Sequence, residues 1–333
     1  MNGFVRSLPL LVLAVAGLLS AQQSRGQTSV TTNPVGFNML TLPAGNNLRV
    51  NTFVQATAFQ GTAASITSAS NSVVTVSATG TPLTSGSFNE VASAPVYYME
   101  VLGTSGGMQG LIVDVVSNNG STITVNSNLP SLGVSGTTSF CIRPHTTLSS
   151  LFPASTAALS PFLDTVELFF SNNTSQVFTF TGAGDGWLNE SGSDSGSQIV
   201  YPGQGFIITV QAAKSVPVMG WVKPGPTIVP LYAGVNNLVG TINPMITGTQ
   251  ALSTFNFPAS FVPYLDAVQV FYDTGALQSG GAFLSNGTNM ITSGSGTPSD
   301  SVPVNPSNSV VVNVQQNELW TMQSFYTTGT SGQ

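Results

Sequence analysis

A residue pattern that occurs twice along the chain places the strongest constraint on its fold. In each copy a Leu-Ser pair is followed by Phe-Pro-Ala-Ser and then by Leu-Asp before an alternating apolar run, at residues 148–170 and again at 252–272. The match continues, because residues 202–210 align with 306–314. A repeat of this length predicts two units that share one fold.

Short runs of β-branched residues, bounded by Gly, Pro, Asn and Ser, predict strands along the whole chain. The clearest runs are residues 73–76, 112–116, 122–125, 206–210 and 310–314. The pair Asn119-Gly120 between two of these runs predicts a tight hairpin, because both residues tolerate positive φ. Helix is expected for one or two turns at most, around Thr147 to Phe152. These signals predict an all-β fold.

The small number of charged residues excludes several classes of protein. Charged residues make up 5% of the 333 positions, and hydrophobic residues make up 41%. A disordered chain needs more charge and less hydrophobicity, and long solvated helices need many more Glu, Lys and Arg residues. With 12 acidic residues and 6 Lys and Arg, the chain cannot offer the basic face that binds nucleic acid.

The first copy of the repeat is predicted to contain an insertion. The segment 44–48 resembles 233–238, but the first lies far from its Leu-Ser pair and the second lies close to it. We therefore predict two duplicated β-sandwich-like units, with a small β module inserted in the first. A module spliced into a loop enters and leaves at neighbouring points, so its two ends are expected to be close in space.

These observations give a domain map for the whole chain. A signal peptide is predicted at residues 1–26 and a linker at 223–229, because Lys223-Pro224-Gly225-Pro226 cannot continue a strand or helix. The units between them are predicted as the first β unit at 27–50 and 142–222, the inserted module at 51–141 and the second β unit at 230–333.

The first 26 residues have the features of a secretory signal peptide. Arg6 precedes an apolar run from Leu8 to Leu19, and the small residues Ala21 and Gly26 follow it. The run is shorter than the roughly 20 residues that span a bilayer, which favours cleavage over an uncleaved anchor. The chain is therefore predicted to be secreted or held at the cell surface, with no transmembrane helix after the signal is removed.

Several short motifs resemble a known group of proteins. The segments 33–37 (Asn-Pro-Val-Gly-Phe), 142–144 (Ile-Arg-Pro) and Thr147-Leu148 resemble a family of uncharacterised secreted β-rich proteins of verrucomicrobial bacteria. In that family an aromatic residue often precedes the Thr-Leu pair, where this chain has Thr146. The resemblance implies secretion and a β-rich fold, and it supplies no activity, cofactor or catalytic residue.

The residue types that carry most catalytic and metal chemistry are scarce. Cys141 and His145 are the single cysteine and the single histidine of the chain, and a structural zinc site needs about four such ligands. Cys141 is expected to be a small buried residue rather than a nucleophile. His145, which follows Pro144, is expected to be a turn residue rather than a catalytic base. We predict no catalytic, cofactor-binding or metal site.

Asp164 and Asp266 occupy the same place in the two copies, after a Pro-containing turn and before an apolar strand. One interpretation is a carboxylate of a glycoside hydrolase, which needs two acids roughly 5–10 Å apart. The other is a side chain that accepts hydrogen bonds from turn backbone amides. The repetition favours the structural interpretation.

Residues 185–194 form the one acidic loop of the sequence. Asp185, Trp187 and Asn189 are the candidate ligand-binding residues, because an exposed ring beside hydrogen-bonding groups can hold the face of a sugar. The loop does not match the spacing of an EF-hand calcium site. A solvated hairpin loop without a ligand is the alternative.

Two functions from different classes remain after these exclusions. We predict a secreted, non-enzymatic structural or adhesive protein, whose partners are further copies of itself or components of the cell envelope. Strands rich in Thr, Ser, Asn and Gln lack the charge that normally prevents edge-to-edge pairing. The alternative is a glycan-binding module that uses Trp187, and a hydrolase is the third possibility.

Overall fold

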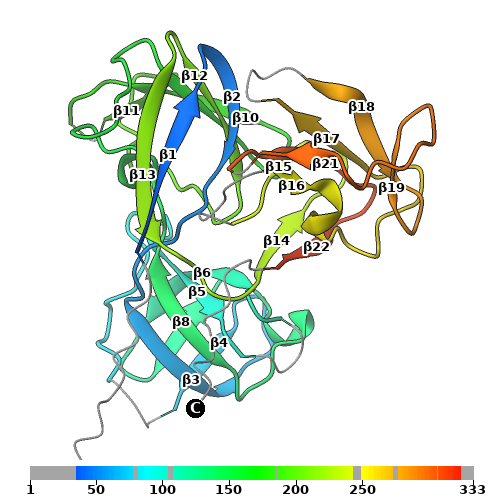
Figure 1. Ribbon diagram of the computed structural model, residues 1–333. Coiled ribbons are helices and arrows are strands. Elements are labelled where there is room, and N and C mark those ends of the chain that lie inside the picture. The colour runs from blue at the N-terminus through cyan, green and yellow to red at the C-terminus, as the bar shows by residue number, and fades with distance from the viewer. Residues whose placement is uncertain are drawn as a thin grey trace, which may run out of the picture. The chain divides into compact units, whose positions relative to one another are not determined.

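The computed structural model describes residues 35–77, 82–103, 108–184, 186–242, 249–272, 277–305 and 307–323. Strands form most of its regular structure, which confirms the predicted all-β class (Figure 1). The helical elements are η1 (Pro130–Leu132), α2 (Leu148–Leu151) and η2 (Leu252–Phe255). Helix α2 lies where helix was expected, and Thr147 caps it by accepting a hydrogen bond from Ser150 N. The predicted signal peptide lies outside the described residues.

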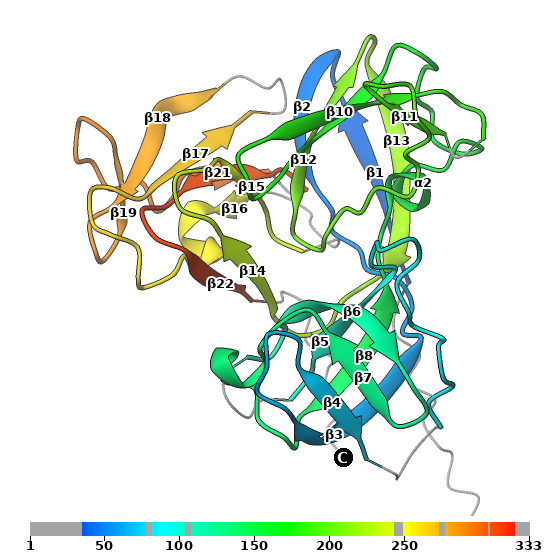
Figure 2. The same ribbon diagram turned by 180° about the vertical axis from the view of Figure 1, so that it is seen from behind.

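Six strands in the N-terminal part of the chain close into a barrel in the order β3-β4-β7-β6-β5-β8 (Figure 2). They are β3 (Phe59–Ile66), β4 (Val73–Val76), β5 (Tyr97–Val101), β6 (Ile112–Asn118), β7 (Thr122–Val125) and β8 (Ser139–Pro144). The first strand pairs with the last, and Phe59 lies opposite Ile142. The two ends of this segment are therefore adjacent, as predicted, and closure leaves the barrel without free edges.

The predicted hairpin joins β6 to β7, but the conformation of its turn differs from the expectation. Neither Asn119 nor Gly120 has a positive φ. Instead the Asn119 side chain accepts hydrogen bonds from the backbone N–H groups of Ser121 and Thr122, both at 2.8 Å. An Asn side chain that mimics a backbone turn in this way gives the same reversal of the chain.

Two five-stranded antiparallel sheets share one order of strands. The first contains β2 (Gly45–Val50), β9 (Thr165–Phe169), β10 (Ser175–Phe180), β11 (Trp187–Asn189) and β12 (Gly205–Val210), in the order β11-β10-β9-β12-β2. The second contains β15 (Asn237–Val239), β17 (Ala267–Phe271), β18 (Leu277–Ser285), β19 (Met290–Thr292) and β21 (Val310–Asn313), in the order β15-β21-β17-β18-β19. In the first sheet the last strand along the chain, β12, lies between the first two, β2 and β9. In the second sheet β21 likewise lies between β15 and β17. In both sheets the remaining two strands continue outward from the second strand.

Pairs of strands complete the architecture. They are β1 (Val35–Leu42) with β13 (Lys214–Trp221), β14 (Thr227–Leu231) with β22 (Glu318–Met322), and β16 (Gln250–Ala251) with β20 (Pro303–Val304). Strand β14 begins inside the segment predicted as a linker, and β8 continues past the predicted end of the inserted module.

The alternating strands bury one face, as their sequences indicate. Val166 and Leu168 of β9 are fully buried, and so are Val268 and Val270 of β17. Their neighbours correspond as well, because Val166 pairs with Ile208 of β12 and Val268 pairs with Val312 of β21. The buried hydrophobic residues form three clusters, one inside the barrel and one against each five-stranded sheet.

Candidate functional site

The predicted ligand-binding loop places its tryptophan in the protein interior. Trp187 is 1% exposed, and its ring lies against Phe152 and Phe180, with centroid distances of 6.1 and 5.3 Å. The expectation of an exposed ring is therefore wrong. Trp187 begins strand β11, and the alternation of that short strand turns its side chain toward the core. A sugar has no access to the faces of this ring.

The other two candidate residues of that loop have different outcomes. Asp185 lies outside the described residues. Asn189 holds the turn that follows β11, because its Oδ1 accepts hydrogen bonds from Ser191 N at 3.1 Å and Ser193 N at 2.9 Å. This role matches the alternative of a hairpin loop, and a ligand-binding role for the loop stays a prediction.

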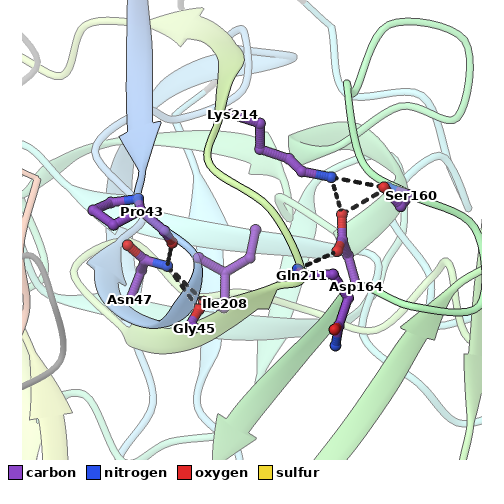
Figure 3. A network of polar contacts seen from close by, with 8 residues as sticks. All are labelled: Pro43, Gly45, Asn47, Ser160, Asp164, Ile208, Gln211 and Lys214. Atoms are coloured by element: carbon purple, nitrogen blue, oxygen red, sulfur yellow. Dashed lines mark hydrogen bonds and ion pairs between the residues drawn. The ribbon is translucent and has the colours of Figure 1, made fainter.

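Asp164 is completely buried and holds two segments of backbone together (Figure 3). Its Oδ2 accepts a hydrogen bond from Ser160 N at 2.6 Å, and its Oδ1 accepts one from Gln211 N at 3.0 Å. The ammonium group of Lys214 contacts the same carboxylate. The carboxylate is thus fully occupied by the fold, as the structural interpretation predicts.

Asp266 is equally buried and has the corresponding partners in the second half of the chain. Its Oδ2 accepts from Val262 N at 2.6 Å, and its Oδ1 accepts from Gln315 N at 2.8 Å. Here Glu318 stands at the strand position of Lys214, because Leu231 pairs with Glu318 as Leu42 pairs with Lys214. Burial, together with the nearby Asp266, raises the pKa of Glu318.

A second pair of equivalent residues is formed by two asparagines. Asn47 donates to the carbonyl oxygens of Pro43 and Gly45 at 2.9 Å and of Ile208 at 3.3 Å (Figure 3). Asn237 donates in the same way to Tyr232 O, Val235 O and Val312 O, at 2.9, 3.3 and 3.0 Å. The repeated Asn-Asn-Leu pattern was visible in the sequence, but the distant carbonyl partners were not.

Cys141 is buried, as expected, and its surroundings oppose ionisation. Its Sγ lies 3.6 Å from Glu100 Oε2, and burial with this neighbouring carboxylate raises the pKa of the thiol to about 12. Glu100 in turn pairs with Arg143 Nε at 3.1 Å and with Lys223 Nζ at 2.7 Å. A thiol that stays protonated at neutral pH is a poor nucleophile.

His145 lies directly after β8 and is 4% exposed. Its Nε2 lies 3.2 Å from Asp114 Oδ1, and its ring lies between those of Tyr98 and Tyr201, each with a centroid distance of 5.1 Å. His145 is therefore not the turn residue that was expected: it lies buried in the segment between β8 and α2, and its backbone N–H donates to Val96 O at 2.9 Å. Asp114 and Tyr201 are functional candidates that sequence reasoning missed, because they are distant in sequence from His145 and from each other.

Strands β1 and β13 form a two-stranded ribbon (Figure 1). One face of this ribbon carries exposed apolar side chains. We call it the ribbon face and define it by three cross-strand pairs: Val35 with Trp221, Phe37 with Met219, and Met39 with Pro217. Phe37 is 62% exposed and Met219 is 56% exposed. The opposite face of the ribbon contributes Leu40, Leu42, Val216 and Val218 to the core. Both faces of this ribbon are therefore apolar, and only one is covered.

Neither a metal cluster nor a membrane-spanning helix is present in the described part of the chain. No group of three or more His, Cys, Asp or Glu side chains there is arranged to hold a metal ion. No helix there has the length and hydrophobicity needed to cross a bilayer. Comparisons of the chain with protein-family models, curated proteins and solved structures find no match.

Proposed function

We propose that the protein is a secreted, non-enzymatic structural or adhesive protein of the cell surface or extracellular matrix, and that it acts by associating with further copies of itself. The ribbon face carries this proposal. Exposed apolar patches formed by several contiguous side chains mark surfaces that a partner covers. Six side chains on two paired strands, with exposed Phe and Met at the centre, form such a patch.

The equivalent surface elsewhere in the chain supports burial of this face by protein. Met39 and Ile228 occupy corresponding positions on the two ribbons. Met39 lies three residues before Leu42, which pairs with Lys214, and Ile228 lies three residues before Leu231, which pairs with Glu318. Met39 is 45% exposed, whereas Ile228 is 3% exposed and belongs to the hydrophobic cluster of the barrel. The ribbon of β14 and β22 thus packs this face against protein within the chain, while the ribbon of β1 and β13 leaves it bare.

A second copy of the chain is the partner that the surface fits best. The ribbon face contains no charged side chain, so it favours an apolar partner over the charged surface of an envelope polymer. Among the described residues, the two strands have no further neighbour in their sheet, apart from a bridge between Val54 and Trp221. Two such ribbons packed face to face would bury the apolar rows of both copies, which is the self-complementary contact of a symmetric dimer.

The domain map is part of the same proposal. We infer that the two five-stranded sheets belong to duplicated sandwich-like units and that the barrel is inserted in the first. The shared strand order and the matching partners of Asp164 and Asp266 support common descent of the two units. The pairing of Phe59 with Ile142 supports insertion at one point.

Sedimentation velocity over a wide range of protein concentration tests self-association. The variant Phe37→Ser with Met219→Ser should sediment as a monomer at concentrations where the wild type associates. The matched control is Tyr264→Ser with Leu265→Ser, which removes two apolar residues of similar exposure and should associate like the wild type. A wild type that stays monomeric throughout, or a ribbon variant that associates normally, would refute the proposal.

A further inference from the structure

A cleft of about 550 Å³ lies between strand β6 of the barrel and segments near residues 169–171, 201–204 and 228–239. Its walls are largely apolar, and they include Leu111, Val113, Leu132, Ile228, Val229, Val235 and Leu238. Clefts of this size with apolar walls and a few convergent polar groups are the usual form of small-molecule sites in proteins. The polar groups in this cleft decide which ligand fits.

The polar groups converge on the carboxylate of Asp114. Tyr201 OH donates to Asp114 Oδ2 at 3.1 Å, and Asn126 Nδ2 donates to the same oxygen at 3.1 Å. His145 Nε2 lies 3.2 Å from Oδ1, behind the cleft. Tyr232 reaches the cleft from the loop after β14. The site therefore combines residues from four separate stretches of the chain.

Two partly exposed tyrosines line this cleft, and one of them, Tyr201, is hydrogen-bonded to the carboxylate. Tyr201 is 36% exposed and Tyr232 is 37% exposed. Burial raises the pKa of each phenol, and the charge of Asp114 raises it further. Both phenols therefore carry their protons at neutral pH. Tyr201 uses its proton on Asp114, so its oxygen is left to accept a hydrogen bond from a ligand, whereas Tyr232 can donate one.

The charges in the cleft exclude anionic ligands and do not favour cations. Among the described residues that line it, Asp114 is the only one with a charged side chain. An anion would meet this carboxylate without any Lys or Arg to balance it. A cation would find a single carboxylate in an otherwise apolar cleft, and the hydrogen bonds from Tyr201 and Asn126 already compensate part of its charge. Charge complementarity thus favours an uncharged ligand that both donates and accepts hydrogen bonds.

We propose that this cleft binds a neutral glycan, with one sugar ring against Tyr201 and Tyr232 and its hydroxyl groups bonded to Asp114, Asn126 and the phenols. A sugar ring has an apolar C–H face and a polar rim of hydroxyls, which matches a cleft with aromatic and aliphatic walls and few, fixed polar groups. The site is separate from the loop at residues 185–194 and from the ribbon face.

Binding of the purified protein to an array of neutral, sulfated and amine-bearing glycans, followed by calorimetry, tests the proposal. The wild type should bind at least one neutral glycan. Tyr232→Ala should weaken that binding tenfold or more, and Tyr201→Phe, which keeps the ring and loses the hydroxyl, should weaken it less. Tyr264→Ala, which removes an exposed tyrosine outside the cleft, should bind like the wild type.

Two further measurements keep the result unambiguous. Tyr232→Phe keeps the ring and should retain most of the binding, which separates stacking from loss of folding. The ribbon variant Phe37→Ser with Met219→Ser should bind glycan normally, so failure of self-association leaves this proposal standing. Absence of binding to every neutral glycan, a preference for sulfated or amine-bearing ligands, or unchanged binding by a folded Tyr232→Ala would overturn it.

Discussion

Asp164 and Asp266 are corresponding buried carboxylates, and each joins two backbone segments by accepting one backbone N–H on each of its oxygens. They differ in their nearest charged neighbour, because Lys214 contacts Asp164 whereas Glu318 occupies the corresponding strand position near Asp266. The first half of the chain therefore compensates its buried charge with a cation, and the second half places a further acid nearby.

Reversing the charge at position 318 and at position 214 should change the stability of the protein in opposite directions. Glu318→Lys should stabilise the protein by up to about 1 kcal/mol, because it replaces an unfavourable carboxylate by a partly exposed cation near Asp266. Lys214→Glu should destabilise it by about 3 kcal/mol or more, because it leaves Asp164 buried beside a like charge. Urea denaturation of the two variants measures both effects. Destabilisation by Glu318→Lys would contradict this explanation.

Replacing Asp266 by Asn tests the role of its two oxygens. An amide has one acceptor oxygen, so either Val262 N–H or Gln315 N–H would face the amide NH₂ group, at a cost of about 1–3 kcal/mol. The neighbouring change Val268→Asp should cost more, because it buries a charge without a partner. Denaturation midpoints rank the two variants, and a milder effect of Val268→Asp would disprove the assignment of Val268 to the core.

Phe162 and Tyr264 share an unusual backbone conformation that predicts the effect of substitutions. Their φ angles are 61° and 63°, in the left-handed region that disfavours bulky residues, and both side chains are exposed. Phe162→Gly should be neutral or stabilising by up to about 1 kcal/mol. Phe162→Val should destabilise by about 1 kcal/mol or more, because a β-branched residue is strained there. Thermal unfolding measures both effects, and a higher melting temperature for Phe162→Val than for Phe162→Gly would refute this explanation.

Cys141 should make the stability of the protein depend on pH in mild alkali. The thiol of the unfolded chain ionises near pH 8.5, whereas the folded protein holds its proton up to a pKa of about 12. Its contribution is therefore fully present below about pH 8.5 and is lost as the pH rises toward 12, by at most about 1.4 kcal/mol per pH unit.

The variant Cys141→Ala should remove this part of the pH dependence. Urea midpoints between about pH 8.5 and 10 provide the measurement, because the tyrosines of the unfolded chain ionise near pH 10. The change of the urea midpoint with pH is the quantity to compare, and it can be compared even if the variant is less stable than the wild type at every pH. Equal slopes for the variant and the wild type would show that Cys141 does not cause the alkaline loss.

Local sequence determined the class of fold and much of its strand pattern. The β-branched runs at 73–76 and 122–125 are strands β4 and β7 with the same bounds. Alternation of apolar residues also placed Val166 and Val268 on buried faces. These predictions succeeded because strand formation and the choice between two faces depend on neighbouring residues, with a period of two.

Tertiary structure alone decided which faces are covered and which distant residues meet. Met39 and Ile228 have equivalent positions on their ribbons, yet one is exposed and the other is buried against the barrel. Trp187 lies in a polar loop of the sequence, yet it is buried. Asp114, His145 and Tyr201 lie on separate segments that pack together. Periodicity specifies two sides of a strand, but the partner of each side comes from packing between residues far apart in the chain.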